Sequence, residues 1–270
     1  MALQLSFSFL FLVLLPAFSS ADDPFICSRA TYYGSPDCWG TPSNVSLNKV
    51  GAFDEKLQVL MPSSFAGACG FGEFGKYMNG GEVGAAANLY KGGSGCGACY
   101  QVRCTDPRLC NEDGVKIVVT DHGQGDNTDF ILSPRGYGKL ARPNMGAELK
   151  ARGVVDIEFR RIPCQYPGYN LIVKAHESSR FPEYLAIVFL YQAGKKDITA
   201  VELCQEDGKE WRAMRRAYGG VWDMSNPANG PLDLRFRVSG EDGEKWIQLR
   251  SVIPSEWKAG AAYDTAMQLF

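Results

Sequence analysis

The chain has 270 residues, 28 of them basic and 30 acidic, so its formal net charge is −2. This near-balance offers no strong attraction for nucleic acid or for an anionic membrane surface, and it favours a neutral partner. Aromatic residues at 12% and 30 glycines are typical of a β-rich protein with many turns.

The chain begins with an apolar run at residues 5–18, which is followed by the small residues Ser19, Ser20 and Ala21. This pattern predicts a secretory signal peptide over residues 1–21, with cleavage after Ala21. The run is shorter than the ~20 apolar residues that a transmembrane helix needs. We therefore expect a secreted, soluble protein, long enough for two domains of about 100–150 residues each.

Nine cysteines in an exported chain predict a disulfide framework. Eight of them lie between Cys27 and Cys164, and only Cys204 follows. The close spacing of Cys96 to Cys110 also resembles a zinc knuckle, but an oxidising compartment and a content of two histidines disfavour metal binding. We therefore expect a first domain held by disulfides, with no metal or cofactor, and a second domain that depends on its apolar core.

Strand patterns are frequent in the first domain, and helical patterns are short. Residues 115–120 form a buried β-type run, and residues 154–162 alternate apolar and polar side chains. Between them, a Ser-Pro pair is typical of a helix N-cap and first turn and predicts a short helix over residues 133–140. A second short helix is expected over residues 147–152, ended by a glycine.

The turn-rich residues 165–168 (QYPG) are the expected linker between a first domain at 22–164 and a second at 169–270. Downstream, residues 184–191 and 232–238 are predicted strands. The second of these alternates apolar and polar residues, as in a sheet with one face in water. Several such strands between Gly, Asn, Pro and Asp turns predict a β-sandwich of about 100 residues.

Several motifs in chain order carry a resemblance to a known family. They are residues 30–34 (ATYYG), 68–72 (ACGFG), 95–104 (GCGACYQVRC), 119–121 (VTD), 159–168 (FRRIPCQYPG) and 253–257 (IPSEW). Together they resemble the expansins over nearly the whole mature chain. Cys27, Cys38, residues 72–75 (GEFG) and residues 129–133 (DFILS) are similar to the expansin-like B branch rather than to the α- or β-expansins.

The resemblance implies an all-β fold in two parts. The first is a six-stranded double-ψ β-barrel like that of family 45 glycoside hydrolases, and the second is an immunoglobulin-like β-sandwich like a carbohydrate-binding module. The resemblance also implies three disulfides, Cys69–Cys96, Cys99–Cys164 and Cys104–Cys110. Cys27 and Cys38 are then left to pair with each other, and Cys204 stays free.

Residues 44–66 depart from the family pattern, which is shorter at this point. One interpretation of these 23 residues is a functional loop, glycosylated at Asn44 in an Asn-Val-Ser sequon. The other is a retained intron, because residues 43–44 can be encoded with a GTAAT start and residues 65–67 with a TTTGCAG end. We favour the intron. In either case the stretch lies beside residues 31–33 and could obstruct a groove there.

Inverting hydrolysis of a glycosidic bond needs a carboxylic acid and a carboxylate base ~6.5–9.5 Å apart. The base of the related hydrolases is missing here, because Tyr33 is followed by Gly34. The acid of the family's His-Phe-Asp motif aligns with Ile131, while Asp129, two residues before it on the same strand face, could substitute with a different reach. Asp121 matches a second acid of the expansin groove, or is simply a turn residue at a strand end.

A neutral glucan has hydroxyls at its rim and apolar ring faces that aromatic side chains can stack against. In the barrel, the resemblance implies polysaccharide contacts from Thr31, Tyr33 and Asp121. Tyr32 is either a groove aromatic or a core residue.

The second domain is expected to carry an aromatic platform for the same polymer. The resemblance implies that it consists of Tyr184, Tyr218 and Trp222. The other tryptophans of this domain, Trp211, Trp246 and Trp257, are expected in its core or at a boundary. His122 and His176 have no serine or thiolate partner in the sequence that would indicate nucleophilic catalysis.

Our leading hypothesis is a monomeric, extracellular cell-wall protein that lies along cellulose, xyloglucan or a related glucan. It would weaken non-covalent contacts between polymers without breaking a bond, and so would not be an enzyme. One alternative is a weak endoglucanase that uses Asp129 and Asp121, and another is an inert carbohydrate-binding or defence-related wall protein. Release of reducing sugar separates the endoglucanase from the other two, and wall creep under load separates those two from each other.

Overall fold

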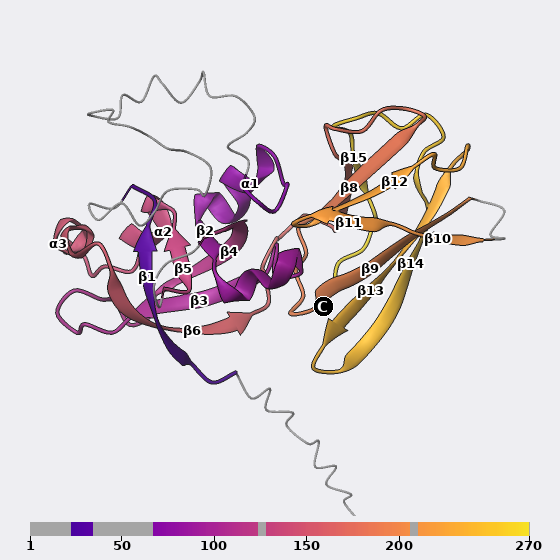
Figure 1. The fold of residues 1–270 in the computed structure, drawn as a ribbon. Coiled ribbons are helices and arrows are strands. Elements are labelled where there is room, and N and C mark those ends of the chain that lie inside the picture. Colours follow the sequence, from indigo (N-terminus) through magenta and orange to yellow (C-terminus); the bar gives the residue numbers. More distant parts are fainter. Residues whose placement is uncertain (1–22, 35–66, 124–127, 206–209, 270) are drawn as a thin grey trace, which may run out of the picture.

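A computed structural model describes residues 23–34, 67–123, 128–205 and 210–269. They form two β-domains that lie side by side, a barrel followed by a sandwich (Figure 1). The predicted signal peptide, the 44–66 stretch with Asn44, and Cys38 fall outside the described residues. Within the described ranges, no helix combines the length and the apolar composition that crossing a bilayer requires.

The first domain is a closed barrel with the strand order β1-β5-β2-β4-β3-β6. Its strands are β1 (Ile26–Tyr32), β2 (Val83–Ala86), β3 (Cys99–Cys104), β4 (Val115–His122), β5 (Phe130–Leu132) and β6 (Val155–Ile162). β1 pairs parallel with β5 and antiparallel with β6, and β2 pairs parallel with β4. This is the six-stranded double-ψ barrel that the resemblance implied, and β4 and β6 coincide closely with the strands predicted from their patterns.

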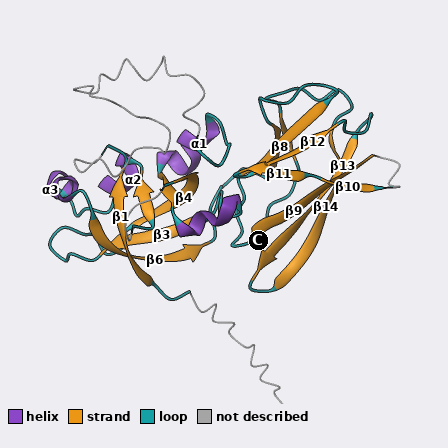
Figure 2. Ribbon diagram, viewed as in Figure 1, coloured by secondary structure: helices purple, strands orange, loops and turns teal. Residues whose placement is uncertain are grey.

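Short helical segments lie over the barrel strands (Figure 2). They are α1 (Phe74–Tyr77), η3 (Met78–Gly81), η4 (Asn88–Gly93), α2 (Pro134–Gly138) and α3 (Gly146–Arg152). The predicted N-cap at Ser133 is confirmed, because its Oγ accepts a hydrogen bond from Gly136 N at 3.0 Å. The predicted end of α3 is also confirmed, because Gly153 has φ +70°, which favours glycine.

The three disulfides implied by the resemblance are present, and all lie in the barrel. They are Cys69–Cys96, Cys99–Cys164 and Cys104–Cys110. Cys204 has a free thiol, as expected, and is buried, while Cys27 is exposed and forms no disulfide with another described cysteine. Because Cys38 lies outside the described residues, the Cys27–Cys38 bridge stays a prediction.

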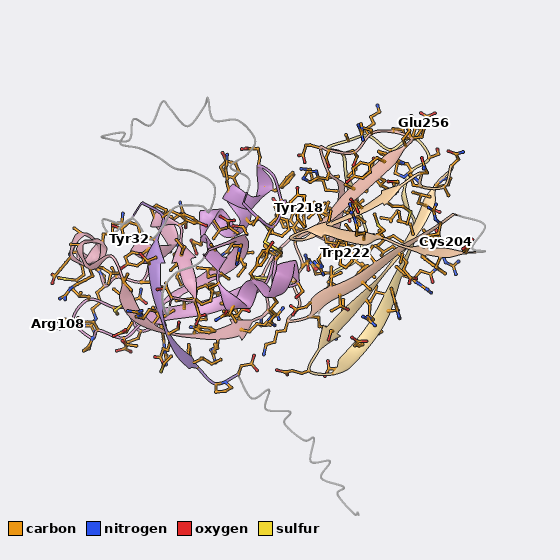
Figure 3. All side chains as sticks on the ribbon, in the orientation of Figure 1. Tyr32, Arg108, Cys204, Tyr218, Trp222 and Glu256 are labelled. Atoms are coloured by element: carbon orange, nitrogen blue, oxygen red, sulfur yellow. A yellow bond between two sulfur atoms is a disulfide. The ribbon has the colours of Figure 1, made fainter. Side chains whose placement is uncertain are left out.

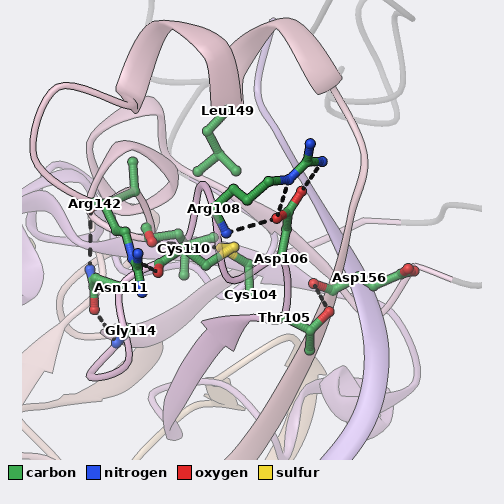
Figure 4. Close-up of a disulfide and its surroundings, with 12 residues drawn as sticks. Cys104, Thr105, Asp106, Arg108, Cys110, Asn111, Gly114, Arg142, Leu149 and Asp156 are labelled. Atoms are coloured by element: carbon green, nitrogen blue, oxygen red, sulfur yellow. Dashed lines mark hydrogen bonds and ion pairs between the residues drawn. A yellow bond between two sulfur atoms is a disulfide. The ribbon is translucent and has the colours of Figure 1, made fainter.

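The Cys104–Cys110 bridge closes a loop that has hydrogen bonds of its own (Figure 4). Asp106 accepts from the backbone N–H of Arg108 at 2.9 Å, and Arg142 Nε donates to the carbonyl of Cys110 at 3.0 Å. These contacts hold the loop in the folded state, so the bridge acts mainly by restricting the unfolded chain.

Replacing Cys104 and Cys110 together by Ser should lower the free energy of unfolding by about 2 kcal/mol, because the closed loop is short. The two residues are 6 apart in sequence, whereas Cys99 and Cys164 are 65 apart, so removal of the longer bridge should cost more. Urea unfolding without reductant measures both differences. An equal or smaller cost for the longer bridge would contradict this account.

The second domain is a sandwich of two antiparallel sheets. The four-stranded sheet has the order β10-β9-β13-β14 and the five-stranded sheet β11-β12-β8-β7-β15. The strands are β7 (Ile172–Ala175), β8 (Tyr184–Leu190), β9 (Asp197–Gln205), β10 (Trp211–Ala213), β11 (Arg215–Tyr218), β12 (Val221–Ser225), β13 (Leu232–Gly240), β14 (Gly243–Ile253) and β15 (Ala262–Asp264). Phe189 and Phe236 meet across the core with ring centroids 4.9 Å apart. β8 and β13 match the strands predicted at 184–191 and 232–238.

The five-stranded sheet packs its outer face against the barrel. Ala186, Val188 and Leu190 of β8 and Val221 of β12 are buried in the same apolar cluster as the barrel core. At the turn between β11 and β12, Gly220 N donates to the carbonyl of Cys69 at 3.0 Å. The approach there requires glycine, because a Cβ on Gly219 would lie 2.1 Å from the Ala68 carbonyl oxygen.

Candidate functional site

One row of residues crosses four neighbouring barrel strands. In the strand register, Asp121 of β4 faces Ala85 of β2, Ala85 faces Ile131 of β5, and Ile131 faces Thr31 of β1. Phe130 fills the barrel core, so Ile131 points to the opposite face, where it is only 2% exposed. The position aligned with the family's acid is therefore a buried apolar residue in line with Asp121.

Asp121 uses both of its carboxylate oxygens within the protein. Oδ2 accepts from the Tyr33 hydroxyl at 2.9 Å, and Oδ1 accepts from the backbone N–H groups of Ala68 at 2.6 Å and His122 at 2.8 Å. Burial, and then the negative charge of Asp121, raise the pKa of Tyr33 well above its ordinary value. Tyr33 therefore remains a neutral donor, and Asp121 ties the end of β4 to β1 and to the loop at Ala68.

Thr31 and Tyr32 are packed against α3 and do not offer their side chains to a glycan. Thr31 is 1% exposed, and its Oγ1 donates to the carbonyl of Gly153 at 3.0 Å. The Tyr32 hydroxyl donates to the carbonyl of Lys150 at 3.1 Å, and its ring lies 4.6 Å from that of Tyr137. The prediction that Thr31 contacts polysaccharide is wrong in this structure, and the core alternative for Tyr32 is confirmed.

Asp129 lies just before β5, and its Oδ2 accepts from the Ser28 hydroxyl at 2.6 Å. It is two residues along the strand from Ile131, and Asp121 is two strands across from Ile131. These offsets place the Cα atoms of Asp121 and Asp129 on the order of 12 Å apart. Both carboxylates are held by partners within the protein, so neither is presented as the free acid or base of a glycosidase pair.

Aromatic side chains continue from Asp121 towards the sandwich. The Tyr90 ring lies 4.5 Å from that of His122 at an interplanar angle of 30°, and the Tyr90 hydroxyl donates to the carbonyl of Ala68 at 3.3 Å. Burial, and then the charge of Asp121, raise the pKa of Tyr90. Tyr90 thus lies between the carboxylate of the barrel and the β11–β12 turn of the sandwich.

Tyr218 lies at the side of the sandwich that faces the barrel (Figure 3). It is 47% exposed, and its hydroxyl oxygen lies 3.0 Å from Nε2 of His176. The Nδ1 atom of His176 is 2.8 Å from the Ser178 hydroxyl oxygen, and burial lowers the pKa of this imidazole. Tyr218 is therefore held in place on one side and open to solvent on the other.

We call the set formed by these residues the junction surface. It consists of Tyr33, Asp121, His122 and Tyr90 from the barrel, and of Tyr218 and His176 from the sandwich. Of the predicted binding residues it includes Tyr33, Asp121 and Tyr218. Tyr90 was not among the predicted residues, because the sequence holds no signal for it. His122 and His176 were set aside, although the two histidines of the whole chain lie at this one junction.

Trp222 does not belong to a surface platform. It is 5% exposed within the sandwich core, and the Arg216 guanidinium lies 4.1 Å above its ring (Figure 3). Along β12 the side chains alternate, so Val221 faces the barrel and Trp222 faces the interior. The prediction that Trp222 stacks on a glycan is therefore wrong in this structure.

Tyr184, the remaining predicted platform residue, is partly buried. Its hydroxyl donates to Asp223 Oδ2 at 2.9 Å, and Arg215 binds the same carboxylate through two hydrogen bonds at 3.0 and 2.6 Å. Burial, and then the Asp223 hydrogen bond, raise the pKa of Tyr184. Its side chain is thus committed to an internal network, and a role in binding stays a prediction.

The other tryptophans of the sandwich divide between core and surface. Trp257 is 3% exposed and confirms the core alternative of the prediction, whereas Trp246 is 40% exposed and lies outside the core. The Arg235 guanidinium lies 4.5 Å from the centroid of Trp211 and 4.8 Å from that of Trp246, so both rings flank one cation on the four-stranded sheet. Over the described ranges, no group of three or more His, Cys, Asp or Glu residues is placed to hold a metal ion.

The fold and the junction surface define a class of two-domain protein in which a double-ψ barrel and a β-sandwich are packed together. Comparison with known sequences identifies the family. A model of the expansin C-terminal domain matches residues 172–254, and a double-psi barrel model described as lytic transglycolase matches residues 82–159. The chain is 51% identical to expansin-like B1 of Arabidopsis thaliana, over 96% of this chain and 94% of that protein. It is 40% identical to expansin-like B1 of Oryza sativa subsp. japonica, over 96% and 93%. The chain belongs to the expansin family, in its expansin-like B branch.

Solved structures share the two-domain fold. The apo expansin of Clavibacter michiganensis matches with a TM-score of 0.60 at 18% identity, over 92% of this chain and 98% of that chain. A mutant of the Clavibacter expansin, solved in complex with cellohexaose, matches with a TM-score of 0.59 at 19% identity, over 91% and 98%. At this level of identity the likeness concerns the fold.

Proposed function

We propose that this protein is secreted to the plant cell wall, binds a neutral wall glucan along the junction surface, and weakens contacts between polymers without cleaving them. The observation that carries this proposal is the pairing of an exposed, positioned Tyr218 with a barrel whose family acid position is the buried Ile131. The first feature supports binding, and the second removes a proton donor.

A neutral polysaccharide is the partner that fits the junction surface. Tyrosine rings provide apolar area for sugar faces at little entropic cost, and their hydroxyls can exchange hydrogen bonds with sugar hydroxyls. The net charge of −2 leaves no field that would select an anionic polymer. The family relationship, and the cellohexaose complex of the Clavibacter expansin, support a β-linked glucan.

Loosening without hydrolysis requires only that the protein binds a separated polymer chain more tightly than a packed one. A bound protein shifts the balance between a packed and a separated polymer chain by the difference in its affinity for the two states. Each 1.4 kcal/mol of that difference changes the ratio about tenfold. The junction surface extends over two domains that are packed through a common apolar cluster, so it presents one fixed surface to a separated chain.

Replacing Tyr218 by Ala should weaken retention on cellulose by roughly 5- to 30-fold, since loss of one aromatic contact is worth about 1–2 kcal/mol. The same variant should reduce creep of heat-inactivated wall strips under load. Tyr77→Ala is the matched control, because Tyr77 is 73% exposed on α1 and lies outside the junction surface. Sedimentation with cellulose and an extensometer provide the two measurements.

Two outcomes would contradict the proposal in different ways. If folded Tyr218→Ala protein binds cellulose as well as the wild type, the junction surface is not the binding surface. If the wild type binds cellulose but never extends walls, the protein is a binding module and the loosening activity is absent.

A further inference from the structure

A cleft of about 1350 Å³ opens between the two domains on a separate set of residues from the junction surface. Residues 163–170, which include the linker, form one part of its wall. Residues 239–242 at the β13–β14 turn form another, and Gln268 and Leu269 complete it near the C-terminus marked in Figure 1. Binding sites occur preferentially at such domain interfaces. None of the six junction-surface residues lines this cleft.

The ionic groups of the cleft neutralise one another. Its lining carries four basic side chains, Lys91, Arg161, Lys195 and Lys196, and four acidic ones, Asp23, Asp197, Glu241 and Asp242. Asp197 pairs with Lys91 at 3.2 Å and with Arg161 at 2.6 Å. Lys195 pairs with Asp23 at 2.9 Å, and Lys196 with Asp242 at 3.5 Å. A cleft whose charges balance, with most of them paired, suits a neutral ligand rather than an acidic or basic one.

An aromatic side chain stands in the cleft wall in a fixed orientation. Tyr169 is 57% exposed, and one face of its ring stacks on Tyr191 with centroids 4.7 Å apart and an interplanar angle of 24°. Tyr191 is in turn held edge-on by Tyr166 at 5.2 Å. Because Tyr191 occupies one face of Tyr169, the other face is the one available to a flat apolar partner such as a pyranose ring.

Two hydrogen-bond donors at the cleft lack partners. Arg161 Nε and Tyr166 Oη are buried, and neither has a hydrogen-bond partner among the described residues. Burial raises the pKa of Tyr166, so its hydroxyl keeps its proton. Buried donors are almost always satisfied, by protein, by water or by a ligand. Both atoms are closed to solvent behind the cleft wall, so an oxygen acceptor of a ligand would reach them only through an enclosed water.

We infer that the cleft is a second saccharide site, which takes a segment of a neutral oligosaccharide with one pyranose ring stacked on Tyr169. This inference goes beyond the proposed function, because the two sites are separate. A protein with both sites holds two glycan segments at once, and the second segment binds at the high effective concentration that the first creates.

Titration of the isotope-labelled mature protein with cellohexaose, followed by amide NMR, tests this site separately from the junction surface. In the wild type, amides near Asn170 and Gly240 should shift, and so should those near Gly219. Tyr169→Ala should raise the dissociation constant read from the cleft amides at least ~10-fold and leave the shifts near Gly219 unchanged. Tyr218→Ala should weaken the response of the amides near Gly219 and leave the dissociation constant read from the cleft amides unchanged.

A blocking variant and a control complete the experiment. Ser239→Trp, which fills the cleft without removing Tyr169, should abolish the cleft shifts, while Tyr77→Ala should leave both sets of shifts intact. Absence of cleft shifts in wild-type protein at saturating cellohexaose overturns the inference. The inference is also overturned if the folded Tyr169→Ala and Ser239→Trp variants bind cellohexaose at the cleft as tightly as the wild type does. It is overturned as well if the cleft amides respond to an oligogalacturonate and not to cellohexaose. A failure of the junction surface alone would be seen near Gly219 only.

Discussion

Trp222→Ala should lower the free energy of unfolding by ~3–5 kcal/mol, the range for truncation of a buried aromatic side chain. Trp222 is 5% exposed in the sandwich core, and its removal also takes away the ring beneath the Arg216 guanidinium. Arg216 is itself anchored by hydrogen bonds to the carbonyls of Gly219 and Ile198 at 2.8 and 2.6 Å. The cavity would therefore be surrounded by groups that cannot easily move into it. Urea unfolding of the mature protein measures the loss.

Tyr218→Ala is the matched comparison, because Tyr218 lies four residues away on the same β-hairpin but is 47% exposed. Its substitution should change stability by no more than ~0.5 kcal/mol, as is usual for surface positions, although it weakens cellulose retention. Trp222→Ala should reduce retention only to the extent that it unfolds the sandwich. A Trp222→Ala protein that is as stable as the wild type and yet loses binding would show that the indole faces the glycan.

The strands β4, β6, β8 and β13 were predicted from their residue patterns, but the inward face of β12 could not be predicted. The polarity of Val221, Trp222 and Asp223 does not show which of them faces the core, and a shift of one residue moves every side chain to the other face. The five-stranded sheet is buried on both faces, by the sandwich core and by the barrel, so polarity gives no signal there. By contrast, β13 has polar residues on its outer face, and its inward residues were predicted correctly.

The three disulfides of the barrel came from the resemblance, since spacing alone leaves the pairing open. The resemblance also carried over Thr31 and Tyr32 as binding candidates, but tertiary packing buries both side chains. Both residues make their hydrogen bonds to carbonyls at the end of α3, some 120 residues later in the chain (the separations are 122 and 118). No local pattern in residues 30–34 indicates that the end of α3 packs over these two side chains.

The junction surface and the cleft could not be predicted from local sequence patterns either, because both join segments that are far apart in the chain. Tyr90 and Tyr218 are brought together by a turn whose glycines permit backbone contact between the domains, and only the packed domains show it. The cleft joins the linker, the β13–β14 turn and the C-terminal residues. A site that is assembled from distant segments is represented in the sequence only by isolated residues. Each of these residues has an ordinary structural interpretation by itself.

The wild-type protein should release no soluble sugar from cellulose, xyloglucan or mixed-linkage glucan on prolonged incubation. Inverting hydrolysis needs an acid and a base ~6.5–9.5 Å apart. The acid position is the buried Ile131, and no carboxylate follows Tyr33 directly in the sequence, where the base of the related hydrolases stands. Loss of one proton-transfer group typically costs 10²–10⁴-fold, so loss of both leaves no rate above background. A reducing-sugar assay on the purified protein measures this.

The two remaining carboxylates are not arranged to replace the missing pair. Asp121 has both oxygens engaged, by Tyr33 and by two backbone N–H groups, and Asp129 is bonded to Ser28. Their Cα atoms lie on the order of 12 Å apart across the barrel strands. Asp121→Asn and Asp129→Asn should therefore give the same blank assay as the wild type. Sustained sugar release that disappears in either variant would establish the endoglucanase alternative. If Asp121→Asn also leaves wall extension unchanged, the carboxylate serves only to hold the end of β4 in place, and the glycan contacts of the junction surface come from its aromatic residues.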